Sequence, residues 1–259
     1  MAAANNILIT GASSGIGRAL ALQMAKTGCV MGLLGRDRER LEHVAMLCRE
    51  KGAAVECGLI DLKRRVETQA WIEDFDRRHP IGLLIANAGV TGGARPGEAI
   101  EPPDESLDVI ETNVMGVLNS VHPLLPRMLS RGGGQIAIMS SLAAFTPLPD
   151  SPSYCASKSA VRTYGLALRQ ALRPHGVKVN VICPGYVRSP MSRRLTGNKQ
   201  FEMSAEDAAV VIERGLERNQ AEIAFPKLFA WMSRIGGLLP DRIRKHTIEP
   251  YRFNVRDAD

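Results

Sequence analysis

A short apolar run near the start of the chain is followed at once by three glycines in the order G-x3-G-x-G. The run covers residues 6–10, the glycines are Gly11, Gly15 and Gly17, and an amphipathic segment begins near residue 15. Glycines at a strand–helix turn let the backbone bend sharply and let a ligand approach it closely. A pyrophosphate then sits on the N-terminus of the helix. This order of elements is typical of a dinucleotide-binding unit.

Short apolar runs continue to alternate with longer amphipathic segments along the chain. The predicted strands are residues 6–10, 29–34, 54–59, 83–87, 135–140, 178–183 and 222–225. The predicted helices begin near residues 15, 38, 64, 105, 153, 205 and 227. Strands that alternate with helices favour a parallel sheet with helices on both faces. We therefore predict an α/β fold, in which residues 1–259 form a single doubly wound Rossmann-type domain with a seven-stranded, mainly parallel sheet.

The composition suits one globular domain and argues against several other classes. Of 259 residues, 45% are hydrophobic and 23% are charged, so a large core can form. We expect no signal peptide and no membrane span, because the chain has no basic, apolar leader and no long apolar run. The five cysteines are scattered and odd in number, which predicts reduced thiols in a cytoplasmic protein.

Two further classes of function receive little support. The chain has no H-E-x-x-H motif, so we do not expect a catalytic metal. The net charge is +6, but the basic residues are dispersed and only 5% of residues are aromatic. Binding of nucleic acid would need basic residues gathered together with stacking aromatics. We therefore expect neither a metal nor a nucleic acid as a partner.

A second motif lies about 125 residues further along, in the order S-x12-Y-x3-K. Its members are Ser141, Tyr154 and Lys158. Tyr154 and Lys158 are four residues apart, so they share one face of a helix. An ammonium beside a phenol lowers the phenol pKa from its usual value of about 10. Such a tyrosine can exchange a proton with an alcohol or carbonyl oxygen. Ser140 is the alternative serine, although the spacing favours Ser141.

Together these motifs resemble those of the short-chain dehydrogenase/reductase family in its shorter form. The T-G-x3-G-x-G motif of the family matches residues 10–17. Its N-N-A-G segment matches residues 86–89, with Ala86 in place of the first asparagine. Its P-G-x3-T/S segment matches Pro184-Gly185, with Ser189 at the hydroxyl position. The matches run in order over residues 10–189.

The resemblance implies a role for each of four catalytic residues. Tyr154 would be the acid/base, and Lys158 would bind the nicotinamide ribose and lower the pKa of Tyr154. Ser141 would polarise the substrate oxygen, and Asn113 would position the lysine through water. The Y-x3-K spacing also favours interconversion of C=O and CH–OH over reduction of C=C. The implied cofactor site comprises Gly11, Ser13, Ser14, Gly15, Ile16, Gly17, Arg36, Asp61, Leu62, Asn87, Ala88, Gly89, Tyr154, Lys158, Pro184, Gly185, Val187 and Ser189.

The end of the second predicted strand bears on the choice between NADP and NAD. Enzymes that use NAD usually carry an acidic residue there to hold the ribose 2′-hydroxyl. This chain has Gly35 followed by Arg36, and a guanidinium pairs well with a 2′-phosphate. Asp37 suits the N-cap of the next helix. We therefore predict NADP, with NAD as the alternative, and by resemblance Asp61 and Leu62 contact the adenine.

The last third of the chain is where the resemblance places the substrate. We predict a substrate loop at residues 190–203 and a C-terminal extension at residues 226–259. The extension has apolar side chains and interleaved basic residues. We expect it to cover the substrate rim or a subunit interface; contact with a membrane surface is an alternative that we do not favour.

These observations lead to a hypothesis about function. The chain is predicted to be an NADP-dependent oxidoreductase that interconverts a ketone or aldehyde and an alcohol. The alternatives are an NAD-linked alcohol dehydrogenase and a catalytically silent, NADP-sensing protein. The expected partners are a small-molecule carbonyl or alcohol substrate, which the sequence does not identify, and further copies of the chain. By resemblance we expect a homodimer or homotetramer formed through residues 105–131 and 153–173.

Overall fold

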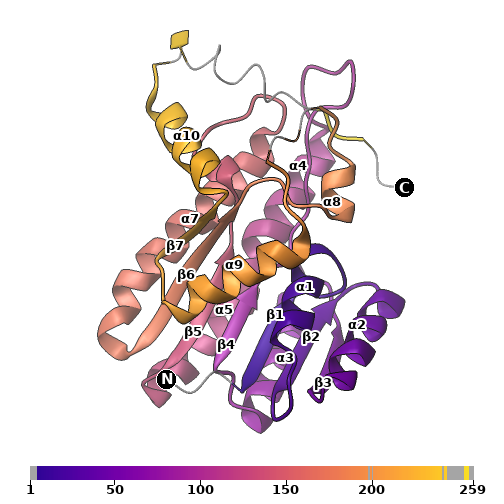
Figure 1. The fold of residues 1–259 in the computed structure, drawn as a ribbon, viewed down its shortest axis with the longest axis vertical. Helices are drawn as coiled ribbons and strands as arrows, with labels where there is room; N and C mark the ends of the chain where they lie inside the picture. Colours follow the sequence, from indigo (N-terminus) through magenta and orange to yellow (C-terminus); the bar gives the residue numbers. More distant parts are fainter. Residues whose placement is uncertain (1–4, 198, 200, 241, 244–253, 257–259) are drawn as a thin grey trace.

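A seven-stranded parallel sheet forms the centre of the molecule, with strand order β3-β2-β1-β4-β5-β6-β7 (Figure 1). The computed structural model describes residues 5–197, 199, 201–240, 242–243 and 254–256. The strands are β1 (Asn6–Thr10), β2 (Val30–Gly35), β3 (Ala54–Leu59), β4 (Leu83–Ala86), β5 (Gly134–Met139), β6 (Val177–Pro184) and β7 (Glu222–Phe225). The α/β fold with a seven-stranded sheet, predicted from the sequence, is confirmed.

Helices cover both faces of this sheet. The helices are α1 (Gly15–Met24), α2 (Arg38–Glu50), α3 (Arg65–Arg78), α4 (Pro103–Ile110), α5 (Gly116–Val121), α6 (Leu125–Arg131), α7 (Pro152–Leu172), α8 (Pro190–Arg193), α9 (Ala205–Glu217) and α10 (Lys227–Leu238). A short π-helical turn occupies Glu111–Met115. Short 3₁₀ turns occupy His122–Leu124, Leu142–Ala144 and Arg173–His175. The predicted helix starts agree with the structure to within about two residues, a usual margin for helix ends.

The central strands contribute to two separate cores, because their side chains alternate between the faces of the sheet. On β1, Ile7 and Ile9 pack with α1, α2 and α9, whereas Leu8 packs with α3, α5 and α7. All three are essentially buried. This explains why the central strands read as continuous apolar runs rather than as alternating ones.

The order of the strands determines where a ligand can bind. The chain runs from β1 outward to β2 and β3, and then returns to place β4 on the other side of β1. The loops that follow β1 and β4 therefore diverge from the same edge of the sheet. In open α/β sheets, ligands bind in the crevice at the carboxyl ends of the strands where the order reverses. The glycine turn after β1 lies at this point.

A short segment near the C-terminus returns to the rim above the sheet. We call residues 254–256 the C-terminal clasp. The backbone N–H of Thr196 donates to the carbonyl of Asn254 at 2.9 Å, and the N–H of Val255 donates to the carbonyl of Ala94 at 3.0 Å. The side chain of Val255 is buried. The clasp thus joins the predicted substrate loop to the loop that follows β4. The remainder of residues 241–259, apart from 242–243, lies outside the described residues.

Two features are absent from the described part of the chain. None of its helices has the length and apolar character needed to cross a membrane. It also has no cluster of three or more histidine, cysteine or carboxylate side chains that could hold a metal ion. All five cysteines are free thiols.

Candidate active site

The turn between β1 and α1 has no space for side chains at two of its glycines. A Cβ atom on Gly11 would lie 2.7 Å from the Cα of Ala88, and Gly11 has a φ of +66°. A Cβ atom on Gly17 would lie 2.2 Å from the carbonyl oxygen of Gly11. In both cases the obstacle is backbone, which cannot move aside. Glycine at these positions therefore lets α1 start directly against the ends of β1 and β4.

Hydrogen bonds join the ends of β1 and β4 beneath this turn. The hydroxyl of Thr10 accepts from the backbone N–H groups of Asn87 and Ala88, each at 3.0 Å. The side-chain amide of Asn87 donates to the carbonyl of Thr10 at 3.0 Å. Ala86, where the family has asparagine, is fully buried in the sheet core. The substitution therefore leaves these hydrogen bonds intact, because Asn87 supplies the amide.

The ends of β2 and β3 present a basic side chain to the cavity. Arg36 is well exposed, and its Nη1 lies 4.0 Å from Oδ2 of Asp61. Asp37 caps α2, because its Oδ1 accepts from the backbone N–H of Arg40 at 2.9 Å. Its other oxygen accepts from Nε of Arg40 at 2.6 Å. The predicted N-cap is confirmed, and the Asp37 carboxylate is committed to α2.

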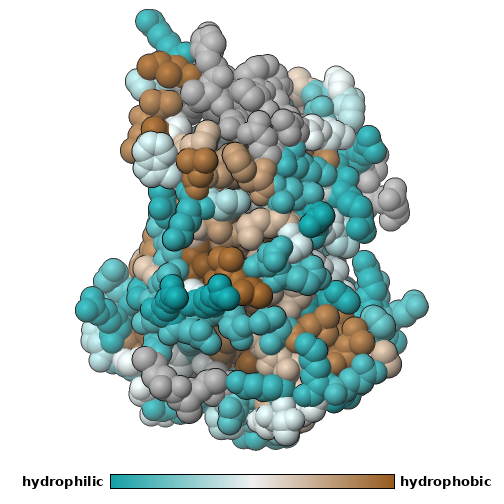
Figure 2. Space-filling view, viewed as in Figure 1, coloured by the Kyte–Doolittle hydropathy of each residue, from teal (hydrophilic) through white to brown (hydrophobic). Residues whose placement is uncertain are grey.

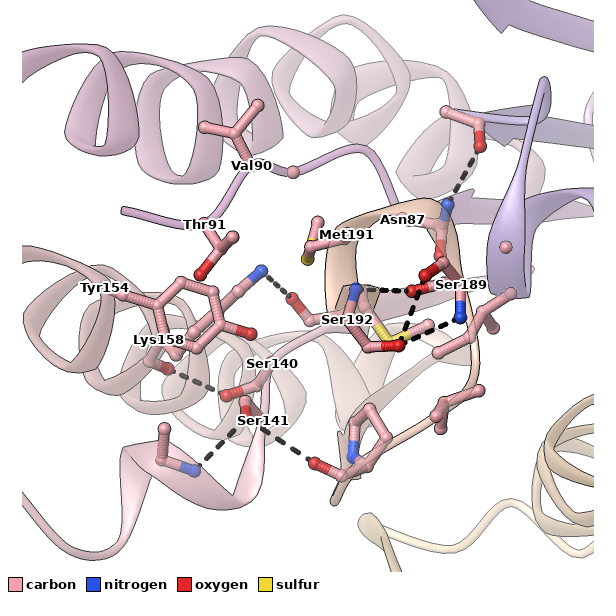
Figure 3. Close-up of a pocket in the computed structure, with 18 of the residues that line it drawn as sticks. Asn87, Val90, Thr91, Ser140, Ser141, Tyr154, Lys158, Ser189, Met191 and Ser192 are labelled. Carbon is pink, nitrogen blue, oxygen red and sulfur yellow. Dashed lines mark hydrogen bonds between the residues drawn. The ribbon is translucent and has the colours of Figure 1, made fainter. Parts of the chain in front are cut away.

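The S-x12-Y-x3-K residues meet at the carboxyl end of β5 (Figure 3). Tyr154 and Lys158 project from the first two turns of α7, and Ser141 begins the 3₁₀ turn after β5. The Ser141 hydroxyl lies close enough to Tyr154 to lower the pKa of its phenol. Nζ of Lys158 lies 5.7 Å from the centre of the Tyr154 ring and donates to the carbonyl of Met139 at 3.2 Å. The three side chains thus form one cluster.

The neighbouring serine has a different position. The hydroxyl of Ser140 donates to the backbone carbonyl of Lys158 at 2.8 Å, and the residue is buried. It therefore connects β5 to α7. The hydroxyl of Ser141 accepts from the N–H of Ala143 at 3.1 Å and faces Tyr154. This geometry favours Ser141 over the alternative, Ser140, as the serine that contacts a substrate.

The acid–base properties of the cluster differ from the sequence-based expectation. We expected Lys158 to lower the pKa of Tyr154. Burial instead raises the pKa of Tyr154 to about 12, partly offset by the hydrogen bond from Ser141. Burial also lowers the pKa of Lys158 to about 8. The physical reason is that loss of hydration disfavours the charged form of both groups.

Asn113 lies behind the cluster, in the π-helical turn Glu111–Met115. Its Oδ1 accepts from the N–H of Val90 at 2.8 Å, and its Nδ2 donates to the carbonyl of Val90 at 2.9 Å and to the hydroxyl of Ser157 at 3.0 Å. A Cβ atom on Gly89 would lie 2.9 Å from Oδ1 of Asn113 and 3.2 Å from Nζ of Lys158. Asn113 therefore fixes the loop after β4 directly beside the lysine.

One cavity of about 640 Å³ connects these groups. It is lined by Gly11, Ser13, Ser14, Gly15, Ile16, Arg36, Asp61, Leu62, Asn87, Ala88, Gly89, Ser141, Tyr154, Lys158, Pro184, Gly185, Val187 and Ser189. Gly17 and Asn113 lie behind this lining and support it. The sequence reasoning did not single out Arg40 or Thr91, which also line the cavity. Arg40 follows Arg36 by four residues in the first turn of α2, a spacing that could have indicated it.

Comparison with known proteins agrees with this arrangement. The family model for short chain dehydrogenase matches residues 5–200. The chain belongs to the short-chain dehydrogenase/reductase family. Its NAD(P)-dependent oxidoreductase activity follows from this membership. The glycine turn fits a dinucleotide because Gly11 and Gly15 line the cavity with backbone alone.

Three members of the short-chain dehydrogenase/reductase family illustrate the similarity. An uncharacterized oxidoreductase from Myxococcus xanthus is 34% identical over 90% of this chain and 92% of its own length. Sulfoacetaldehyde reductase 2 from Chromohalobacter salexigens is 32% identical over 78% of this chain and 79% of its own length. The structure of a short-chain dehydrogenase from Sphingobium yanoikuyae in complex with NADPH has a TM-score of 0.77 and 28% identity. That comparison covers 95% of this chain and 96% of the other.

Proposed function

We propose that this protein interconverts an aldehyde or ketone and the corresponding alcohol, with NADP as the coenzyme. The observation that carries the proposal is the cluster of Ser141, Tyr154 and Lys158 in the same cavity as the glycine turn. A relative named sulfoacetaldehyde reductase 2 supports a carbonyl substrate. The bound coenzyme would supply the hydride, held by the turn at Gly11–Gly15, by Arg36 and by Lys158.

The protein's own side chains would handle the proton. Two hydroxyls, from Ser141 and Tyr154, line the cavity as near neighbours. A carbonyl oxygen beside them can accept a hydrogen bond from each of them. In the reducing direction Tyr154 gives its proton to this oxygen, and in the oxidising direction it takes the proton back.

Lys158 would stabilise the phenolate that forms when Tyr154 gives up its proton. With a pKa of about 8, the lysine is mostly protonated at neutral pH. Its ammonium lies over the Tyr154 ring, and the residue is almost entirely buried. In such a low-dielectric position, a nearby positive charge strongly favours the charged phenolate over the neutral phenol.

The preference for NADP rests on the end of β2. The Arg36 guanidinium is exposed to the cavity, where a 2′-phosphate could pair with it. The only carboxylate in the stretch Gly35–Asp37 belongs to Asp37 and is occupied by α2 and Arg40. It is therefore poorly placed to hold a ribose hydroxyl. The Sphingobium relative holds NADPH, whereas a similar short chain dehydrogenase from Mycobacterium paratuberculosis holds NAD, so the preference rests on Arg36.

The test of the proposed function is Tyr154→Phe, assayed with a panel of aldehydes and ketones against NADPH and, in parallel, NADH. Loss of the exchangeable proton should lower kcat by roughly 10²- to 10⁴-fold. The Kd for NADPH should stay within about twofold, because the ring remains. The measurements are NADPH consumption and nucleotide binding by titration.

Tyr164→Phe is the matched control for this experiment. Tyr164 lies on the same helix, and its buried hydroxyl has no hydrogen-bond partner among the described residues. Its removal should leave kcat unchanged. If Tyr154→Phe kept most of the activity, the proposed mechanism would be wrong. If the wild-type protein bound NADPH but turned over no carbonyl or alcohol, the silent-sensor alternative would replace it.

Assembly into a homodimer or homotetramer, and a cytoplasmic location, remain predictions. The exposed apolar side chains Leu107, Ile110 and Met115 lie along residues 105–131, where the resemblance places a subunit interface. Their exposure supports self-association through this surface.

A further inference from the structure

The two ends of the cavity differ sharply in charge. The charged side chains that line it are Arg36, Asp37, Arg40, Asp61 and Lys158. The first four come from the ends of β2 and β3 and from α2, and Lys158 belongs to the reaction centre. From Tyr154 toward α10, the described residues that line the cavity include no charged side chain.

Helix α10 forms one wall of this uncharged part. Phe229, Met232, Ile235 and Leu239 line the cavity at helical spacing, so one face of the helix points into it. Figure 2 shows apolar side chains gathered where α10 stands at the upper left. Met232 and Ile235 remain more than a third exposed, so their apolar surface is available to a ligand.

A second part of the lining, on the loop after β5 and on α8, is also largely apolar, and two of its hydroxyls are committed within the protein. Leu142, Leu148 and Met191 line it. The hydroxyl of Thr146 donates to the carbonyl of Ser233 on α10. The hydroxyl of Ser192 accepts from the N–H of Ser189 at 3.0 Å, within the capping box of α8. A ligand against α10 and this second part of the lining therefore meets mainly hydrocarbon.

Two basic residues near this region, Arg234 and Arg194, are committed to partners. Arg234 of α10 pairs with Glu222 at 3.3 Å and stacks over the Phe145 ring at 4.9 Å. Arg194 pairs with Glu105 at 3.0 Å and donates to the carbonyl of Arg256 in the C-terminal clasp at 2.9 Å. Neither guanidinium is among the groups that line the cavity. Among the described residues that line this part of the cavity, an anionic substrate would find no counter-charge.

The wall formed by α10 is held firmly in place. Phe145 lies under both Arg234 and Arg162, and both arginines pair with Glu222 at the start of β7. Less than one turn after Arg234, a Cβ atom on Gly237 would lie 2.1 Å from the Phe145 carbonyl oxygen, so the two backbones are in close contact. The helix is therefore anchored to the loop that carries Ser141.

From these observations we infer that the substrate is an uncharged carbonyl compound, or its alcohol, with an extended hydrocarbon group that lies along α10. The inference rests on the proposed function and specifies its substrate class. Burial of hydrocarbon against these apolar parts of the lining would bind the substrate, and Ser141 and Tyr154 would hold its one oxygen. Short charged carbonyls would keep the contacts to their oxygen but would lose the burial of hydrocarbon, and their charge would lie against apolar side chains.

A series of unbranched aldehydes from butanal to decanal tests this inference, with NADPH as reductant. Each buried methylene contributes about 0.8 kcal/mol, so kcat/KM should rise up to about fourfold per methylene until the wall is covered. Sulfoacetaldehyde serves as the short charged comparison and should be the poorest substrate. The inference would be overturned if kcat/KM stayed constant from butanal to decanal, or if sulfoacetaldehyde were the better substrate.

Two substitutions on the same helix locate the effect. Ile235→Asp places a charge on the cavity wall. It should abolish the rise of kcat/KM with the chain length of the aldehyde. Leu228→Asp adds the same charge at an exposed position of α10 that does not line the cavity, and it should leave this rise unchanged. Equal effects of both variants would contradict a binding role for this face. If Ile235→Asp fails to fold, Ile235→Ala replaces it. This variant should reduce the rise of kcat/KM with chain length to half or less.

Binding without turnover separates this inference from the proposed function. Affinities of the alcohols from butanol to decanol, measured by calorimetry in the presence of NADP, should rise with chain length in the wild-type protein and not in Ile235→Asp. If alcohols bind in this way but no aldehyde is reduced, the proposed function fails while the apolar site stands. If aldehydes are reduced but the alcohol affinities show no trend, the inference about substrate class fails alone.

Discussion

The coenzyme end and the substrate end of the cavity are built in opposite ways. At the coenzyme end, backbone meets backbone: a Cβ atom on Gly17 would sit 2.2 Å from a carbonyl oxygen. At the substrate end, the walls are side chains of α10, of which Trp231 and Met232 are well exposed. Backbone contacts tolerate almost no change, whereas exposed side chains can be exchanged without disturbing the sheet. The architecture thus separates a fixed half from an adjustable half.

The largest effect is expected from adding one methyl group to the fixed half. Gly17→Ala would force a Cβ atom against the backbone of Gly11 and the amide of Asn87. We expect destabilisation of about 1–3 kcal/mol or more, with loss of measurable NADPH binding. Thermal unfolding and nucleotide titration measure the two effects.

Gly133→Ala provides the control, because a Cβ atom there would meet no atom within 4 Å. This variant should fold and bind NADPH as the wild type does. Near-normal nucleotide binding by Gly17→Ala would show that the turn is more adaptable than we argue, and the comparison between the two ends would lose its basis.

A smaller effect is expected at the side chain that the fixed half presents to the coenzyme. Loss of a charge-assisted pair with the 2′-phosphate costs about 1.5–3 kcal/mol. Arg36→Asp should therefore weaken NADPH binding about 10- to 150-fold while NADH binding changes much less. Titration of each nucleotide measures the difference.

Arg38→Asp introduces the same charge change two residues away, at an exposed position that does not line the cavity. This variant should weaken the binding of NADPH only slightly. Tighter binding of NADH than of NADPH by the wild-type protein would reject the assignment of NADP.

The smallest effect is expected in the adjustable half, at the C-terminal clasp. Val255→Ala removes buried hydrocarbon worth about 1.5 kcal/mol and should loosen the connection between the substrate loop and Ala94. We expect the KM for the carbonyl to rise a few-fold, while NADPH binding stays constant. Val66→Ala, the same change at an exposed site on α3, should alter neither quantity. An equal loss of NADPH affinity in Val255→Ala would show that the two ends are not independent.

The fixed half was also the more predictable from sequence. The glycine turn, the strands and the cap at Asp37 follow from local rules about glycine, apolar runs and capping side chains, and the structure has all of them. The π-helical turn around Asn113 follows from no local rule, because the π form depends on how α4 and α5 pack in the complete fold. The high pKa of Tyr154 was missed for a similar reason: burial is a property of the folded protein, not of the Y-x3-K spacing.

The adjustable half could be recognised only as a segment of apolar and basic residues. Its sequence indicated that residues after β7 are amphipathic, but not which face of α10 lines the cavity. The decisive contacts join distant parts of the chain, as when Arg162 and Arg234 both stack on Phe145. No spacing rule connects these three residues. The bridge between Leu195 and Val255 is equally distant in sequence.

The positions of the two tryptophans have an optical consequence. Trp71 stacks on Phe75, with ring centres 5.3 Å apart, beside β2 and β3 and away from the cavity. Trp231 lines the cavity and is 62% exposed, so its indole is in contact with water. Indole emission shifts to shorter wavelengths when water is replaced by hydrocarbon. The intrinsic fluorescence of this protein therefore contains one constant component and one that reports, without any label, the arrival of a molecule along α10.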